Sequence, residues 1–214
     1  MSAGKFITLE GIEGAGKSTV AKFVAAWLGE RGVPVRLTRE PGGTPLAERV
    51  RQIVLERAAE PLTAVTETLL MFAGRALHVQ NMIRPALARG EWVVCDRFTD
   101  ATRAYQGSGR AVQADFIETL AAAVHADLTP DCTLLLDLPV ATGLARARAR
   151  PGAAVDRFEA ETVGFFEKVR AGYLALARAE PQRVQVIDAA APLSEVERRV
   201  GQLLARLHAP ERHA

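Results

Sequence analysis

Eight consecutive residues near the start of the chain have the types and the spacing that hold nucleotide phosphates. Residues 11–18 read Gly-Ile-Glu-Gly-Ala-Gly-Lys-Ser, which satisfies the pattern G-x-x-x-x-G-K-[ST]. The glycines allow backbone N–H groups to turn toward phosphate oxygens. Lys17 would reach the β- and γ-phosphates, and the Ser18 hydroxyl would bind Mg²⁺. We predict a phosphate-binding loop here, with Lys17 as a catalytic residue.

The surroundings of this motif indicate an ATP site. An apolar run at 6–9 predicts a strand before the loop, and residues 17–31 predict a helix after it, which is the context that the motif requires. The chain contains neither an N-K-x-D tetrapeptide nor a D-x-x-G segment, which disfavours a switch GTPase. The predicted ATP contacts are Gly11, Ile12, Glu13, Gly14, Ala15, Gly16, Lys17, Ser18 and Thr19.

Three further segments could bind a phosphorylated acceptor. Residues 38–44 (Thr-Arg-Glu-Pro-Gly-Gly-Thr) follow a predicted strand directly, where the ligands of parallel sheets collect. Phe72 and Arg75 lie three apart on a predicted helix and share a face, so a flat ring and a planar donor could together hold a base. Asp96 and Arg97 end an apolar strand, where the carboxylate could hold Mg²⁺ and the guanidinium a phosphate.

Each of these segments also has a purely structural interpretation. Residues 38–44 could form a plain turn with a solvated arginine, and Phe72 could be a core ring beside a surface arginine. Asp96 could belong to a buried structural ion pair. Asp137 ends a strand in the same manner, but no phosphate-binding residue follows it, so we rank it lower.

The order of apolar runs and helix-period segments predicts a single α/β domain over residues 1–214. The fold expected is that of the P-loop NTPases, with about five parallel strands and helices on both faces of the sheet. The predicted strands are 6–9, 33–37, 92–95, 133–136 and 184–187. The predicted helices are 17–31, 45–56, 62–89, 112–125, 139–150, 158–178 and 194–207.

Composition excludes several classes of protein. The chain has 27 basic and 25 acidic side chains, a net charge of +2, which argues against a general nucleic-acid binder. Cys95 and Cys132 lie inside apolar runs, so two buried thiols in a reducing compartment are expected rather than a disulfide. We see no secretion signal and no apolar stretch of membrane-spanning length. A cytoplasmic protein is therefore expected.

The motifs resemble those of the thymidylate kinase family in order and spacing. Besides the phosphate loop they are T-R-E-P-G-G-T, F-A-G-R, D-R-F, A-Y-Q-G and L-L-L-D-L-P, and the resemblance extends over about residues 5–189. It implies phosphorylation of dTMP to dTDP with ATP and Mg²⁺, in dTTP biosynthesis, by a homodimer. The alternatives are another P-loop kinase of a nucleoside or nucleoside monophosphate, and a non-catalytic ATP-dependent switch.

The resemblance also implies roles for individual residues. Arg39, Arg51 and Arg97 would grip the dTMP phosphate. Phe72 would stack on thymine, and Arg75 and Gln106 would bond the polar edge of the base. Further contacts would come from Glu13 near the sugar 3′-hydroxyl, Tyr105 near the 2′ position and Thr102, with Asp96 at the metal.

Two positions depart from the family pattern. Ala101 stands where many members carry Ser, which leaves Thr102 as the only hydroxyl of the pair. The stacking Phe is often four residues before the Arg, whereas Phe72 is three before Arg75. The base pocket could therefore be reached from Phe72 or from Met71.

A basic segment resembles the lid that supplies catalytic arginines in part of this family. The loop positions 12–15 contain no basic residue, whereas a segment at about 146–157 contains Arg146, Arg148 and Arg150, and Arg157 as well. We expect Arg146, Arg148 and Arg150 to act in catalysis with Lys17 and Arg97. The alternative is a solvated basic helix end, which the helix dipole favours.

Overall fold

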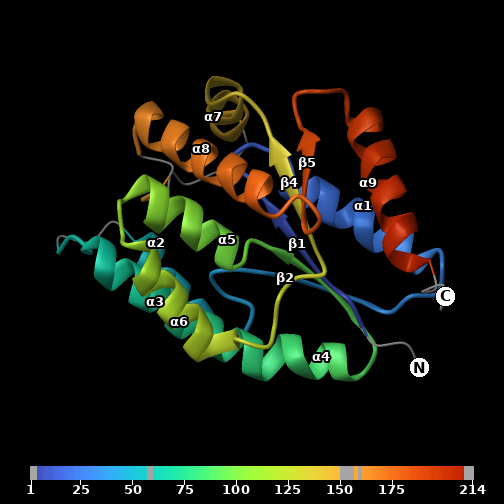
Figure 1. Cartoon of the computed structure of the whole chain (residues 1–214), viewed down its shortest axis with the longest axis horizontal. Coiled ribbons are helices and arrows are strands. Elements are labelled where there is room, and N and C mark those ends of the chain that lie inside the picture. The colour runs from blue at the N-terminus through green and yellow to red at the C-terminus, as the bar shows by residue number, and fades with distance from the viewer. Residues whose placement is uncertain (1–3, 57–59, 150–156, 159–160, 210–214) are drawn as a thin grey trace.

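A parallel sheet forms the centre of the fold (Figure 1). The computed structural model describes residues 4–56, 60–149, 157–158 and 161–209. The sheet is 5-stranded, in the order β2-β3-β1-β4-β5, and each neighbouring pair is parallel. Its strands are β1 (Phe6–Glu10), β2 (Val35–Arg39), β3 (Trp92–Asp96), β4 (Cys132–Asp137) and β5 (Val184–Asp188). The predicted α/β fold with about five parallel strands is confirmed.

The position of each strand in the sheet explains its burial. β1 is buried throughout, and β3 and β4 are buried except at their last residue, which is half-buried in each. Cys95 and Cys132 lie buried in β3 and β4 as free thiols. The edge strands β2 and β5 expose part of their surface, including Leu37 and Val186. Continuous apolar sequence thus marks the central strands, which helices cover on both faces.

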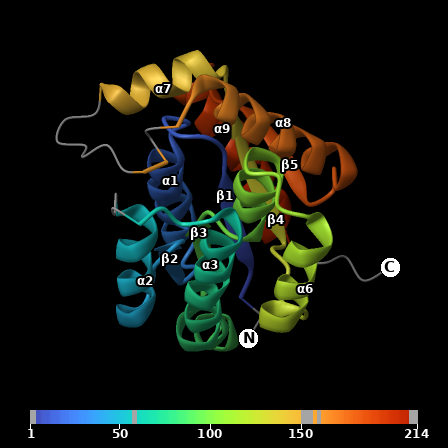
Figure 2. The same cartoon turned by 90° about the vertical axis from the view of Figure 1, so that its left-hand side faces the viewer.

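Helices lie on both faces of the sheet. α1 and α9 pack against each other on one face, and α8 contacts β4 and β5 on the other (Figure 1). α2, α3 and α6 lie next to one another in the view turned by 90° (Figure 2). The α-helices are α1 (Lys17–Gly29), α2 (Pro45–Leu55), α3 (Ala64–His78), α4 (Arg84–Ala88), α5 (Thr99–Thr102), α6 (Ala114–His125), α7 (Val140–Arg148), α8 (Val163–Ala179) and α9 (Leu193–His208).

Local sequence explains where several helices begin. Thr44, Thr63 and Thr162 each accept a hydrogen bond from a backbone N–H of the first turn, at the starts of α2, α3 and α8. Pro45 follows Thr44 at the first helical position, where its missing N–H has no cost. The cap at Thr162 places the start of α8 at 163, later than the predicted start at 158.

Two helical segments differ from the sequence-based expectation. The single helix predicted over 62–89 is divided into α3, a π-helical turn η1 (Val79–Ile83) and α4. Residues 99–109, for which no element was predicted, form α5 and a second π-helical segment, η2 (Arg103–Gly109). Short segments containing glycines give weak periodicity, so their helical form depends on packing, here against α8.

Parallel pairing brings the carboxyl ends of the strands to one edge of the sheet. Asp96 at the end of β3 pairs in register with Leu9 of β1 and with Arg39 of β2. The phosphate loop follows β1, so residues from three strand ends meet at this edge. This is where ligands of open α/β sheets bind.

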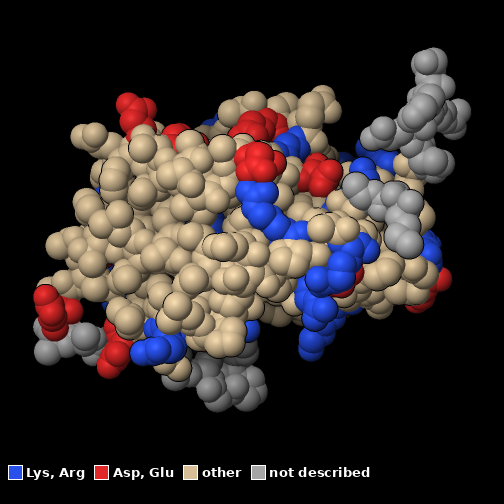
Figure 3. Space-filling model, turned by 90° about the horizontal axis from the view of Figure 1, so that it is seen from below, with Lys and Arg blue, Asp and Glu red and all other residues tan. Residues whose placement is uncertain are grey.

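The outer surface carries charges of both signs. On the face seen in Figure 3, acidic side chains lie among the basic ones, and much of the surface is uncharged. This mixture agrees with the net charge of +2. Within the described residues, no helix is both long enough and apolar enough to span a membrane.

Candidate active site

A cavity of about 460 Å³ lies at the carboxyl edge of the sheet and connects the phosphate loop to α3, α5 and η2. Most of the predicted site residues line it: Glu13, Gly14, Gly16, Lys17, Ser18, Thr19, Arg39, Arg51, Arg75, Asp96, Arg97, Thr102, Tyr105, Gln106 and Arg146. Met71 and Glu40 line it as well. The predicted residues that do not are Gly11, Ile12, Ala15, Phe72 and Arg148, while Arg150 lies outside the described residues.

The phosphate loop has the conformation that its glycines permit. Gly14 and Gly16 adopt positive φ angles of 73° and 89°. Lys17 begins α1 and is buried, and its Nζ donates to the carbonyls of Gly11 and Ile12, both at 3.0 Å. Burial, together with the positive charge of Arg97, lowers the pKa of Lys17 from 10.5 to about 8. Phosphate oxygens would supply the negative partner that this cation needs.

Gly14 and Gly16 are required for different reasons. A Cβ at Gly14 would lie 2.0 Å from the carbonyl oxygen of Gly143 in α7, so α7 approaches the loop too closely for any side chain there. A Cβ at Gly16 would meet nothing within 4 Å. The open space over Gly16 adjoins the N–H groups at the start of α1, where phosphate oxygens would lie.

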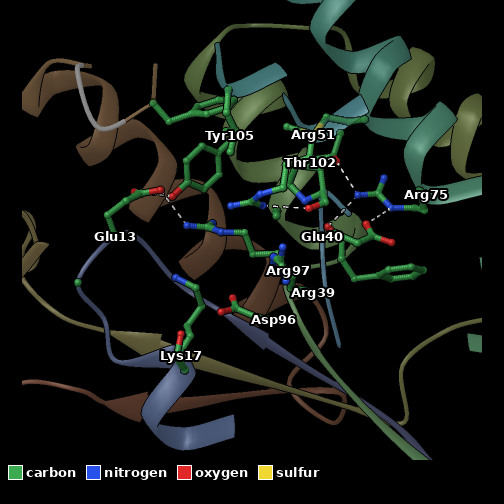
Figure 4. A pocket seen from close by; sticks show the side chains of 18 of the residues that line it. Glu13, Lys17, Arg39, Glu40, Arg51, Arg75, Asp96, Arg97, Thr102 and Tyr105 are labelled. Carbon is green, nitrogen blue, oxygen red and sulfur yellow. Dashed lines mark hydrogen bonds and ion pairs between the residues drawn. The ribbon is translucent and has the colours of Figure 1, made fainter. Parts of the chain in front are cut away.

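Arg97 connects the phosphate loop to the side of the cavity that Arg39 and Arg51 line, which we call the acceptor side (Figure 4). It follows β3 with a φ of 72°, and its Nη2 donates to Glu13 Oε1 at 2.9 Å. Its guanidinium also lies over the ring of Tyr105, whose hydroxyl donates to Glu13 Oε2 at 2.7 Å. Arg97 Nη1 donates to the hydroxyl of Tyr173 at 3.3 Å. The structure thus brings together three residues that sequence analysis had assigned separately, and adds Tyr173.

A buried carboxyl group supports Arg97 from behind. Glu10 ends β1, and its Oε2 accepts from the Tyr173 hydroxyl at 2.7 Å while its Oε1 accepts from the backbone N–H of Phe98. Burial, together with the neighbouring Asp100 carboxylate, raises the pKa of Glu10 from 4.5 to about 8. Sequence analysis missed Glu10, although its position directly before the phosphate loop is a signal that could have found it.

The other end of the cavity is built around Arg75. Arg75 Nε donates to Glu40 Oε2 at 2.7 Å, and Nη2 donates to Phe98 O and to Thr102 Oγ1, both at 3.1 Å. Glu40 Oε1 contacts His78 Nδ1 at 2.9 Å. Arg75 Nη1 is buried and has no hydrogen-bond partner in the described structure. One donor of this guanidinium is therefore left for a ligand.

Phe72, the residue predicted to stack on the base, lies behind the cavity wall, whereas the alternative, Met71, lines the cavity. Phe72 is 2 % exposed, does not line the cavity and packs in a cluster with Ile117 and Ala121. Met71 lines the cavity together with Arg75. Residues four apart on a helix lie on the same face, whereas one step along the helix turns the side chain by about 100°. The Phe72 ring instead lies under the Arg75 guanidinium, with 4.7 Å between the ring centre and Arg75 Cζ.

Arg39 and Arg51 reach the cavity from β2 and α2. Arg39 is exposed, and its Nη2 lies 2.9 Å from Glu48 Oε2. Arg51 Nη1 donates to the carbonyl of Pro41 at 2.9 Å. With Arg97 they place three guanidinium groups along the acceptor side of the cavity.

The predicted lid arginines lie in different surroundings. Arg146 lines the cavity from α7, and its Nη1 donates to the carbonyl of Ala189 at 2.8 Å. Arg148 is exposed in the last turn of α7 and does not line the cavity. Residues 150–156, which include Arg150 and most of the predicted lid, lie outside the described residues.

Two side chains of the cavity fit a magnesium ion. Ser18 is exposed at the start of α1, and Asp96 Oδ1 is buried with no hydrogen-bond partner in the described structure. Mg²⁺ at phosphate sites is typically held by one or two carboxylates, with waters and substrate phosphates completing its shell. Asp137 does not fit this role, because both its oxygens accept hydrogen bonds from Arg170, at 2.7 and 2.9 Å.

The glycines of the loop provide a first prediction. Gly32 lies outside the loop, after α1, and serves as a control. Gly16→Ala and Gly32→Ala should each lower the free energy of unfolding by about 1–2 kcal/mol, because both positions have positive φ and open space around the new Cβ. Only Gly16→Ala should also weaken ATP binding, because its methyl group enters the phosphate space. Gly14→Ala should lose more stability than either, since α7 must move. Chemical denaturation and ATP titration measure both effects, and equal stability loss in all three would contradict the contact with α7.

Glu10 provides a second prediction. Its raised pKa means that the folded state holds a proton which the unfolded chain has released above pH 4.5. The contribution of this proton to the free energy of unfolding is therefore complete below pH 4.5, and it is lost as the pH rises to about 8. The wild type should thus lose stability relative to Glu10→Gln over this range, by a few kcal/mol at most, since one pKa unit is worth about 1.36 kcal/mol. Denaturation at several pH values, with exposed Glu30→Gln as control, measures this difference, and parallel profiles would contradict it.

Comparisons with known proteins find close relatives of this chain. A family model described as "Thymidylate kinase" matches residues 9–200. The thymidylate kinase of Pseudomonas entomophila (strain L48) is 56% identical over 202 residues, which are 94% of this chain and 95% of that protein. The thymidylate kinase of Pseudomonas putida (strain W619) is 57% identical over 199 residues, 93% of this chain and 95% of that protein.

A solved structure shares the fold. The crystal structure of thymidylate kinase from Ehrlichia chaffeensis superposes with a TM-score of 0.78 and 33% sequence identity, over 95% of this chain and 100% of that chain. The family model covers the phosphate loop, the arginines of the acceptor side and α7. The chain belongs to the thymidylate kinase family.

Proposed function

We propose that this protein transfers the γ-phosphoryl group of ATP to dTMP, forming dTDP and ADP for dTTP biosynthesis. One observation carries the proposal: a single cavity joins a phosphate-binding loop to a second cluster of guanidinium groups and a buried polar end. Phosphoryl transfer requires two phosphate groups to be aligned and their negative charge to be stabilised. Family membership supports thymidylate as the acceptor.

The phosphate loop would hold the donor nucleotide. Backbone N–H groups of the loop would surround the phosphates of ATP, and Lys17 would leave its two carbonyl partners to contact them. Ser18 and Asp96 would hold Mg²⁺, in keeping with the unpartnered Oδ1 of Asp96. When bound, the ion would neutralise charge on the β- and γ-phosphates.

The three arginines of the acceptor side would hold the phosphate of dTMP. Arg97 is more enclosed than Arg39, and a phosphate would offer it a charged partner in addition to Glu13. Tyr105 and Glu13 are joined by a hydrogen bond beside this position, which suits contact with the deoxyribose. The base would lie at the far end of the cavity, next to Met71, Arg75 and Gln106.

Arg146 is the lid arginine with the strongest support for a role in catalysis. It lines the same cavity as Lys17, and its guanidinium is held by a backbone carbonyl that a γ-phosphate could replace. Arg148 points to solvent at the end of α7, where the helix dipole alone favours a cation. We retain Arg150 as a proposed catalytic residue on the family resemblance.

This difference between Arg146 and Arg148 gives a third prediction. Arg146→Ala should lower kcat by roughly 10³-fold or more, the range in which an arginine stabilises a phosphoryl transition state. ATP and dTMP dissociation constants should change little, because the contact forms mainly in the transition state. Arg148→Ala is the matched control and should keep kcat within about twofold. Steady-state kinetics and equilibrium titration measure both, and the same kcat in the two variants would contradict the assignment.

A panel of acceptors gives a fourth prediction and tests the function itself. With ATP and Mg²⁺, dTMP should be converted to dTDP. We expect dCMP and dAMP to react at least about tenfold more slowly, since each mispaired buried polar group costs about 1–3 kcal/mol. Thymidine should also react at least about tenfold more slowly, because it lacks the phosphate that the arginines would hold. Release of ADP is followed by a coupled assay and the product by chromatography. Preference for thymidine would favour the nucleoside kinase alternative. ATP binding without turnover for any acceptor would favour the switch.

We also propose a homodimer and a cytoplasmic location. Apolar side chains exposed on α2 and α3, which include Leu46, Ile53, Val65 and Leu69, support a surface that a second copy could cover. Two buried free thiols suit a reducing compartment.

A further inference from the structure

A buried carboxylate accepts a hydrogen bond from a residue that lines the cavity near Arg75. Glu67 in α3 is 0% exposed, and Gln106 in η2 is 1% exposed. Gln106 Nε2 donates to Glu67 Oε1 at 2.6 Å. The two residues are far apart in sequence, and the contact depends on the packing of α3 against η2.

The chemistry of the pair determines which end of the amide faces the cavity. An ionised carboxylate only accepts hydrogen bonds, so the amide must present its NH₂ group to Glu67. Arg110 Nε lies 2.9 and 3.0 Å from the two oxygens of Glu67, and Arg157 Nη2 lies 2.6 Å from Oε2. Two guanidinium groups thus occupy the other hydrogen-bonding positions of Glu67. The carbonyl of Gln106 is left as the acceptor, and no described side chain donates to it.

The neighbouring arginine presents the opposite polarity. Arg75 Nη1 is a buried donor without a partner in the described structure, and both Arg75 and Gln106 line the cavity. A donor and an acceptor therefore stand together at this end. A pyrimidine with a 4-keto oxygen and an N3–H group matches both of them. Cytosine offers an amino group and an N3 lone pair, which repel both.

We propose that Glu67 is a positioning residue that selects the base, by fixing the Gln106 amide with its carbonyl toward the N3–H of thymine. The inference rests on the proposed function, because it requires the base to lie at this end of the cavity. Glu67 does not touch the substrate and acts only through Gln106. The remaining contacts of Glu67, with Arg110 and Arg157, keep it in place.

A double-mutant cycle between Glu67 and Gln106 provides the fifth prediction. Glu67→Gln keeps the shape but can also donate, so the Gln106 amide is no longer fixed. We expect it to weaken dTMP binding about tenfold and to lower the dTMP preference over dCMP, with ATP binding unchanged. In a Gln106→Met background, the same change should alter dTMP binding by no more than about twofold. Arg110→Gln is the matched control: it removes one charged partner of Glu67, but Arg157 still holds the carboxylate and the Gln106 amide still faces it. This variant should retain the preference.

The cycle separates failure of this inference from failure of the proposed base site. If Gln106→Met leaves dTMP binding unchanged, the base does not lie at Gln106 and both fail. If Gln106→Met weakens binding but Glu67→Gln does not, or if Glu67→Gln acts equally in both backgrounds, the role of Glu67 alone is overturned. Calorimetric titration with dTMP, dCMP and ATP gives all the constants.

A measurement on the wild-type protein covers the case in which Glu67→Gln does not fold. Isotope labelling of Gln106 allows its side-chain resonances to be followed during dTMP titration. The carbonyl carbon should shift on binding, while the NH₂ protons bonded to Glu67 should keep their shift and exchange slowly. A large shift of the NH₂ protons with an unchanged carbonyl would show the opposite orientation and overturn the proposal.

Discussion

The pairing of Arg97 with Glu13 holds the two halves of the cavity together, because it extends from the end of β3 to the phosphate loop. A charge removed from water requires compensation, and here Glu13 and the hydroxyl of Tyr173 supply it. Glu10 in turn fixes Tyr173. The guanidinium of Arg97 thereby links the ends of β1 and β3, the phosphate loop and α8. The residue that joins these elements is also well placed to receive a phosphate.

The same constraint operates at the base end of the cavity. Glu40 holds Arg75, and Glu67 holds Gln106, each through a short hydrogen bond in a buried setting. Each of these cavity-lining polar groups is thus fixed in advance by a carboxylate behind it. Such preorganisation reduces the ordering that binding would otherwise require. Carboxylates thus lie behind the polar groups that line this end of the cavity.

Much of the fold follows from local sequence. The central strands are apolar because they are covered on both faces, and threonines mark the starts of three helices. The turns of the phosphate loop are made by its own glycines, directly before the first turn of α1. Residues 99–109 gave no such pattern, because four residues of α-helix followed by a glycine-containing π-helical segment have no readable period. Packing against α8 determines their form.

The sequence alone determined the chemistry available: a phosphate loop ending in Lys17 and Ser18, arginines after the strands, and a carboxylate at Asp96. Only the tertiary structure decided that Met71 rather than Phe72 faces the cavity, and that Arg146 rather than Arg148 lines it. It also paired Gln106 with Glu67, 39 residues away. Motifs depend on neighbours within one or two turns, which the sequence displays. The direction in which a side chain points, and the distant residue that it contacts, depend on how whole helices pack. No local spacing encodes that packing.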